Sequence, residues 1–219
     1  MSAGVAGLIF ALLFSGAVAL IRTLPVLSSS DAEIARWFAS GGDNQAVVGG
    51  LYLAPFAGVA FLWFIAVVRD QIGEREDRFF ATVFFGSGLL FVALFFAAAA
   101  VAASFVVGVQ YLDQAAPRAS DLAEIRALSY TFLFGFATRA AALFMFSTAT
   151  VGLRSRTFPR WFALLGYLVG LVLLVVVSFF DWVVLLFPVW VAFVSLFILR
   201  RERARSRTAR TTTLDGASR

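Results

Sequence analysis

The stretch that decides the fold is Leu89–Ala103, "LLFVALFFAAAAVAA", which carries no charged side chain. A helix that spans a membrane needs about 20 such residues, because a rise of about 1.5 Å per residue must cross about 30 Å of hydrocarbon. The apolar run extends in both directions and covers Phe79–Phe105. Strands of an outer-membrane barrel would alternate apolar and polar residues, so this run predicts a helix.

The composition of the whole chain extends this prediction to further segments. Hydrophobic residues make up 61% of the 219 residues and charged residues only 14%, with a mean hydropathy of +0.91. That leaves too little polar surface for a soluble globule. We therefore predict an all-α, polytopic transmembrane bundle with six spans. The predicted spans are Ala3–Ile21, Gln45–Val68, Phe79–Phe105, Ser129–Leu153, Trp161–Phe180 and Val183–Leu199.

The arginines predict the orientation, since the chain has no lysine and no histidine. If the six spans alternate in direction, most arginines fall on one side, together with the whole basic tail. The loops of the other side hold only Arg22, Arg36, Arg118 and Arg126. By the positive-inside rule, both termini are expected in the cytoplasm, in a multi-pass protein of a bacterial inner membrane. The net charge of +5 then follows from membrane insertion and does not indicate a nucleic-acid partner.

The C-terminal segment, residues 200–219, has no apolar periodicity, so we expect a disordered tail beside a transmembrane domain of residues 1–199. Arginines next to a membrane attract anionic lipid headgroups by about 1 kcal/mol each. The alternative interpretation is a simple stop-transfer anchor. The arginines predicted to contact lipid headgroups are Arg200, Arg201, Arg203 and Arg205.

Two loops on the predicted outer side have the pattern of short amphipathic helices. In "SSSDAEIARWFAS", Ser30 and Glu33 have the spacing of a capping box, and Ile34, Trp37 and Phe38 follow at helical spacing. In "RASDLAEIRALSY", Ser120 or Asp121 is the expected N-cap of a helix that continues into the fourth span. The expected apolar stripe of this second helix is Leu122, Ile125 and Leu128.

Several chemistries are excluded by the residue types that the chain lacks. Without His or Cys there is no zinc motif, no bis-histidine haem, no serine–histidine pair and no thiolate nucleophile. The interiors of the six predicted spans also contain no Asp or Glu, which argues against an aspartyl protease or a buried proton relay. We therefore expect neither an enzyme nor a resident cofactor or metal.

Two resemblances add little to these expectations. The loop "RDQIGEREDR" partly resembles the loop motif of major facilitator transporters, with matches at Asp70, Gly73 and Arg75, but six spans are only half of such a transporter. A solvated turn of self-neutralising charge is the preferred interpretation. In architecture and composition the whole chain resembles uncharacterised six-helix membrane proteins of GC-rich bacteria, a resemblance that implies no activity.

The most unusual residue of the predicted spans is Arg139, in the segment Gly135–Phe144, "GFATRAAALF". Arg139 comes ten residues after Ser129, so its backbone is expected about 15 Å below the edge of the membrane. A charge there costs about 2.5–3.5 kcal/mol on insertion scales, and more in direct contact with lipid. The arginine is therefore expected to point into the bundle.

Three surroundings would make this arginine tolerable. It reaches Asp181 at the outer turn, helped by Tyr52 at a similar depth; or it bonds carbonyls freed near Pro55 or Pro188; or it lines a wet cavity that attracts an anion or a lipid headgroup. The first two are structural and the third is functional, and the sequence does not choose between them.

The functional hypothesis is a non-enzymatic membrane protein that binds or transports a small anionic or amphipathic solute. Its candidate ligand-binding residues are Arg139, Tyr52 and Asp181. The alternative is a structural or accessory subunit of a membrane complex, with another membrane protein or a second copy of the chain as partner.

Overall fold

The computed structural model describes residues 3–25, 28–72, 78–154, 158–175 and 183–200, and every regular element in these ranges is helical. The elements are α1 (Ala3–Ile21), α2 (Asp31–Ala39), α3 (Gly42–Ile72), α4 (Arg78–Tyr111), α5 (Ala119–Tyr130), the π-helix η1 (Thr131–Ala137), α6 (Thr138–Arg154), α7 (Arg160–Val175) and the 3-10 turn η2 (Val183–Leu185). The turn η2 opens a last helix, called here the C-terminal helix, which runs over Val183–Arg200.

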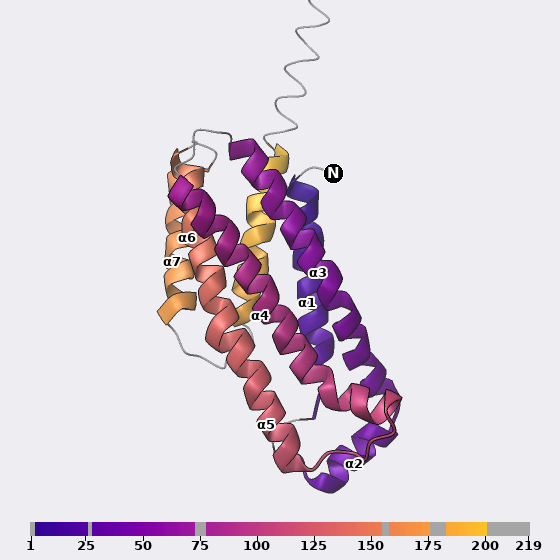
Figure 1. The fold of residues 1–219 in the computed structure, drawn as a ribbon. Coiled ribbons are helices and arrows are strands. Elements are labelled where there is room, and N and C mark those ends of the chain that lie inside the picture. Colours follow the sequence, from indigo (N-terminus) through magenta and orange to yellow (C-terminus); the bar gives the residue numbers. More distant parts are fainter. Residues whose placement is uncertain (1–2, 26–27, 73–77, 155–157, 176–182, 201–219) are drawn as a thin grey trace, which may run out of the picture.

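The long helices lie side by side in one elongated bundle (Figure 1). Helix α1 packs closely on α3, α4 packs against both α3 and α6, and α7 covers α6. At one end of the bundle lie α2 and the beginning of α5. The start of α1 and the end of the C-terminal helix meet at the opposite end, where Gly4 packs under the Leu199 side chain.

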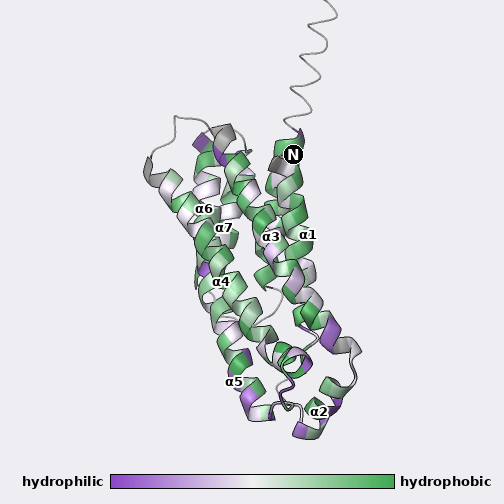
Figure 2. Cartoon of the chain, turned by 45° about the vertical axis from the view of Figure 1, so that its right-hand side comes forward, coloured by the Kyte–Doolittle hydropathy of each residue, from purple (hydrophilic) through white to green (hydrophobic). Residues whose placement is uncertain are grey.

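Five of these helices are long and apolar enough to cross a membrane: α1, α3, α4, the continuous α5–η1–α6 helix and the C-terminal helix. Figure 2 shows the same division, with hydrophobic residues along the long helices and hydrophilic ones around α2 and the start of α5. The prediction of an all-helical chain with several apolar helices is confirmed, and this architecture is compatible with a membrane protein. The described part of α7 is shorter, at 16 residues, and the predicted fifth span continues beyond it into residues outside the described ranges.

The helix predicted after Ser30 is present as α2, together with its capping box. The Ser30 hydroxyl accepts a bond from the Glu33 backbone N–H at 3.4 Å, and the Ser30 N–H donates to Glu33 Oε2 at 2.7 Å. These bonds satisfy N–H groups that the first turn of a helix otherwise leaves without partners. Ile34 and Phe38 are buried, so α2 attaches to the bundle by the face that the sequence pattern indicates.

The predicted cap of the second short helix was wrong by two to three residues. Arg118 is the N-cap of α5, and Asp121 lies at the third helical position, where its carboxylate accepts the Arg118 N–H at 3.4 Å. The reason is a contact far away in sequence: Asp31 Oδ1 accepts the Ala119 N–H at 2.7 Å. A carboxylate at the start of α2 thus accepts a backbone N–H at the start of α5. A local sequence pattern cannot reveal this contact.

The expected apolar stripe of α5 is only partly correct. Leu122 is buried and Ile125 is half-buried, but Leu128 is exposed and the neighbouring Ser129 is buried in its place. Ser129 is tolerated there because its hydroxyl donates to the Ala98 carbonyl of α4 at 2.9 Å. A polar contact between helices therefore sets which face of α5 points inward.

The centre of the bundle is a cluster of phenylalanine rings contributed by five helices. Phe61 of α3 lies in the middle, with its ring centroid 4.5 Å from that of Phe10 in α1 and 5.0 Å from that of Phe144 in α6. Phe91 of α4 and Phe187 of the C-terminal helix complete the cluster at 5.4 and 5.5 Å from Phe61. All five rings have at most 1% of their surface exposed.

The capping box of α2 gives a prediction for the effect of pH. Bonds from the Ser30 backbone N–H and hydroxyl, and the nearby charge of Arg36, lower the pKa of Glu33. A lowered pKa stabilises folded α2 above the ordinary glutamate pKa, and this stabilisation is lost as the pH falls through the folded-state pKa. We therefore expect the amide protons of α2 to lose protection against exchange, after correction for intrinsic rates, as the pH falls below about 4. Glu33→Gln keeps a capping side chain that cannot titrate and should abolish this dependence; an equal loss in both proteins would contradict the prediction.

Candidate functional site

A narrow cleft lies between α1, α4 and the α5–η1 helix, and we call it the α1–α5 slot. It forms because α5 and η1 pack on α4 while α1 packs chiefly on α3, so that α1 and α5 pack only loosely against each other. The slot contains about 660 Å³ of empty space including its open mouth. Its apolar walls include Val18 and Ile21 of α1, Phe95 and Ala99 of α4, and Leu133 and Phe134 of η1.

Small side chains of α4 form the floor of the slot. Ala98, Ala99 and Ala102 lie at helical spacing on one face of α4 and line the slot together. Because an alanine projects only a methyl group, this face leaves room between α1 and α5 that larger side chains would fill. The apolar run that indicates the fold thus also supplies the space of the candidate site.

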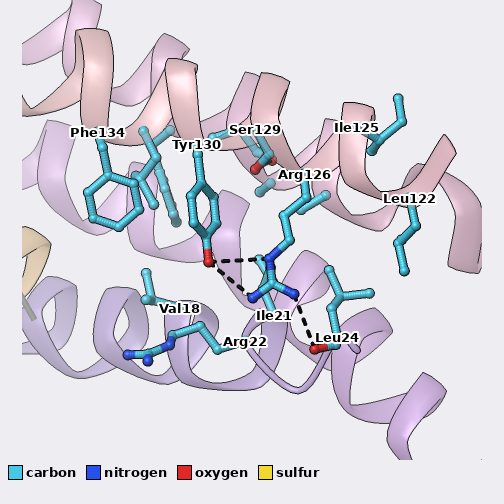
Figure 3. A pocket seen from close by; sticks show the side chains of 15 residues that line it. Val18, Ile21, Arg22, Leu24, Leu122, Ile125, Arg126, Ser129, Tyr130 and Phe134 are labelled. Carbon is cyan, nitrogen blue, oxygen red and sulfur yellow. Dashed lines mark hydrogen bonds between the residues drawn. The ribbon is translucent and has the colours of Figure 1, made fainter. Parts of the chain in front are cut away.

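The charged side chains among the described residues that line the slot are Arg22 and Arg126. Arg126 is half-buried, and its Nε and Nη2 donate to the Tyr130 hydroxyl at 3.3 and 3.1 Å (Figure 3). Its Nη1 donates to the carbonyls of Leu24, at 3.4 Å, and of Pro25. The guanidinium carbon lies 5.4 Å from the centroid of the Tyr130 ring.

These contacts have two consequences. The first is structural, because Arg126 connects the segment after α1 to α5 and so helps to form the slot. The second concerns charge, because the described hydrogen-bond acceptors of Arg126, two carbonyls and a phenol, are all neutral. Arg22 follows directly after α1 and also lines the slot, and in Figure 3 its side chain runs back along α1 toward Val18, away from Arg126. An anionic group in this part of the slot would be attracted by two guanidinium groups.

The predicted site residue Arg139 lies elsewhere, on α6, and is half-buried. Its Nη1 donates to the Phe134 carbonyl and to Thr138 Oγ1, the latter at 3.3 Å. In the π-helix the Thr138 N–H bonds to the Leu133 carbonyl, so the Phe134 carbonyl loses its usual α-helical donor. Arg139 therefore bonds a backbone carbonyl, as the second of the three expectations has it, but this carbonyl belongs to the π-helix and does not lie near Pro55 or Pro188 in sequence.

The other two predicted site residues do not join Arg139 in the described structure. Tyr52 of α3 is 68% exposed and lines a shallow groove with Pro55 and with Tyr111 of α4, and the described hydrogen bonds of Arg139 do not include it. Asp181 lies outside the described residues. Binding of a ligand by Arg139, Tyr52 and Asp181 stays a prediction.

Small residues near Arg139 on the same helix are Gly135 and Ala142, and one of them serves helix packing. Ala142 is fully buried, and a Cβ atom added at Gly170 of α7 would lie 3.4 Å from the Ala142 carbonyl. On this side, therefore, the small residue serves the close approach of α6 and α7. Gly135 is half-buried, and a Cβ atom there would meet only the Thr131 side chain within 4 Å.

Sequence reasoning missed the α1–α5 slot, although local signals of it exist. Arg126 and Tyr130 lie four residues apart, the spacing at which helical side chains meet, and the alanines of α4 follow the same helical face. Neither signal indicates that α1 lies opposite. Comparison of the chain with models of protein families, with curated proteins and with solved structures found no match. The function is therefore argued from the geometry of the slot.

The contacts of Arg139 predict the effect of removing it. Arg139→Met is expected to leave the free energy of unfolding within about 1 kcal/mol of the wild-type value or to raise it, because a half-buried charge is costly. The Thr138 hydroxyl still donates to the Phe134 carbonyl at 2.7 Å in this variant. Adding Thr138→Val removes this donor as well and should lower the free energy of unfolding by about a further 1–3 kcal/mol. Unfolding in mixed micelles measures both, and a loss of about 3 kcal/mol in Arg139→Met alone would contradict this account.

Proposed function

We propose that the chain is a six-span integral membrane protein that binds a small amphipathic anion in the α1–α5 slot. The observation that carries the proposal is the composition of the slot, whose described lining is apolar except for a few polar groups and two arginines. Pockets for small molecules are commonly apolar with a few placed polar groups, and here these groups have positive charge.

The walls of the slot match the two parts of such a ligand. An apolar chain would lie against Val18, Phe95 and Leu133. Its carboxylate or phosphate would lie near Arg22 and Arg126, where charge-assisted hydrogen bonds are stronger than those to neutral groups. Because Arg126 bonds only neutral acceptors among the described residues, an anion would also compensate its charge in a region of low dielectric constant.

The distribution of arginines supports the placement of the protein in its membrane. With both termini in the cytoplasm of a bacterial cell, α2 and the start of α5 lie on the outer side and the slot lies at the outer ends of the spans. The protein acts without catalysis, as a binding protein or a carrier. Its basic C-terminal residues contact anionic headgroups on the inner side.

Binding of dodecyl phosphate, measured by native mass spectrometry and by thermal stabilisation in a mild detergent, tests this function. The wild-type protein is expected to bind it at least about tenfold more tightly than uncharged dodecyl maltoside, because only the phosphate pairs with the guanidinium groups. Arg22→Gln should remove most of this preference. Arg36→Gln, which removes an exposed arginine of α2, is the matched control and should bind like wild type.

A second variant separates a failure of the fold from a failure of binding. Ile125 is half-buried and lines the slot, so Ile125→Trp should obstruct the slot while the bundle folds. Loss of binding in folded Ile125→Trp supports the slot as the site. Equal affinity for the charged and the uncharged amphiphile, or unchanged binding in both Arg22→Gln and Ile125→Trp, overturns the proposal.

A further inference from the structure

A second groove adjoins the α1–α5 slot on the other side of α1. Ser15, Val18, Ala19 and Arg22 of the α1 segment line it together with Leu185 at the start of the C-terminal helix. It contains about 480 Å³ of empty space including its open side. We call it the α1–Leu185 groove. The small side chains of Ser15 and Ala19, four residues apart on α1, leave this space.

Two residues line both the slot and the groove, namely Val18 and Arg22. Arg22 follows Val18 by one helical turn, and its backbone N–H still donates to the Val18 carbonyl at 3.0 Å. The two side chains therefore share one face of α1, with the nearly buried Val18 as the ridge between the two clefts and Arg22 at the end of that ridge. One cation thus stands where two apolar clefts meet.

We infer that the ligand of this site is an anionic phospholipid with two acyl chains, which straddles the end of α1. One chain lies in the α1–α5 slot and the other in the α1–Leu185 groove, and the phosphate lies at Arg22 between them. This inference rests on the proposed function and adds the class of ligand to it.

Two observations favour a two-chain lipid over a molecule with one chain. The groove offers a second apolar surface that shares the same arginine. The guanidinium of Arg22 has several donors in one plane, which matches the oxygens of a phosphate.

The test uses phosphatidylglycerol and lysophosphatidylglycerol, which have the same headgroup but two chains and one chain. Each lipid is titrated into the full-length protein in mild detergent, and the bound fraction is measured by native mass spectrometry. The wild-type protein is expected to bind the two-chain lipid at least about tenfold more tightly, because only this lipid occupies both clefts. Phosphatidylcholine, whose headgroup has no net charge, should bind more weakly than phosphatidylglycerol.

Two variants obstruct one cleft each. Ala19 is exposed and lines only the groove, so Ala19→Phe should reduce binding of phosphatidylglycerol to about the level of the lyso lipid and leave the lyso lipid unaffected. Ile125→Trp, which obstructs the slot, should weaken the binding of both lipids. Leu12→Phe changes a side chain of α1 that is 75% exposed and lines neither cleft, so it is the control for added bulk.

The outcomes separate this inference from the proposed function. If both lipids bind equally, or if Ala19→Phe binds phosphatidylglycerol like Leu12→Phe, the two-chain inference is wrong while binding of an amphipathic anion stands. If neither lipid is weakened by Ile125→Trp, both the inference and the proposed function fail.

Discussion

Phe61→Ala is expected to lower the free energy of unfolding by about 3–5 kcal/mol, the range found for large aromatic residues truncated in a packed core. The Phe61 ring is fully buried in the middle of the phenylalanine cluster. It contacts rings of α1, α4, α6 and the C-terminal helix, with centroids 4.5 to 5.5 Å away. No other ring named in the cluster joins so many helices at these distances.

The cost arises from packing and not from exclusion of water. In a bilayer the lipid tails are as apolar as the side chains, so helices associate through van der Waals contact. Removing the ring leaves a cavity whose walls belong to separate helices, and each surrounding ring loses contacts on one side. The walls can close this cavity only if whole helices move, which keeps the penalty near the upper end of the usual range.

Phe56→Ala is the matched control, because Phe56 lies on the same helix and loses the same atoms, but its side chain is 63% exposed. We expect a change within about 0.5 kcal/mol for this variant. Unfolding is measured in mixed micelles by titration with a denaturing detergent and followed by circular dichroism. If the two variants lose the same stability, the cluster does not hold the bundle together.

The helices themselves could be predicted well because their signals are local. The predicted first span, Ala3–Ile21, coincides with α1. Its end was predictable because the apolar run stops at Arg22. The capping box of α2 was likewise predictable, because Ser30 and Glu33 satisfy each other within one turn. Such signals require no knowledge of what lies opposite in the folded chain.

The features that escaped prediction depend on contacts between distant segments or on small changes of backbone geometry. The start of α5 is fixed by Asp31, which is 88 residues away in sequence from Ala119. The π-helix over "TFLFGFA" has no marker in its residue types, yet it contains the Phe134 carbonyl that accepts a bond from Arg139. The place of this arginine within a long apolar helix was foreseeable, but its partner was not.

The candidate site also depends on contacts between distant segments, so the sequence did not reveal it. In the sequence Arg22 and Arg126 were only two of the arginines used to predict the orientation, because their roles in the slot depend on where α1 lies relative to α5. That position is set by the close packing of α1 on α3. The slot is therefore a property of the tertiary arrangement, and its integrity depends on the α1–α3 interface.

Gly50→Val is accordingly expected to destabilise the protein by about 3 kcal/mol and to abolish binding in the slot. A Cβ atom at Gly50 of α3 would lie 2.9 Å from the Ala17 carbonyl oxygen and 2.8 Å from Ile21 Cγ1. The first contact is with backbone, which no change of rotamer can relieve, so α1 must move away from α3. Such a movement displaces Ile21, which lines the slot, and with it the adjoining Arg22.

Gly49→Val provides the control for this argument, because both substitutions make the same change in helix propensity one residue apart. A Cβ atom at Gly49 would meet only Leu20 Cδ1, at an ordinary contact distance of 3.7 Å. We expect this variant to unfold within about 1 kcal/mol of wild type and to retain binding of dodecyl phosphate. Equal losses in the two variants would mean that the glycines act through helix propensity, and retained binding in Gly50→Val would mean that the slot does not depend on the close approach of α1 to α3.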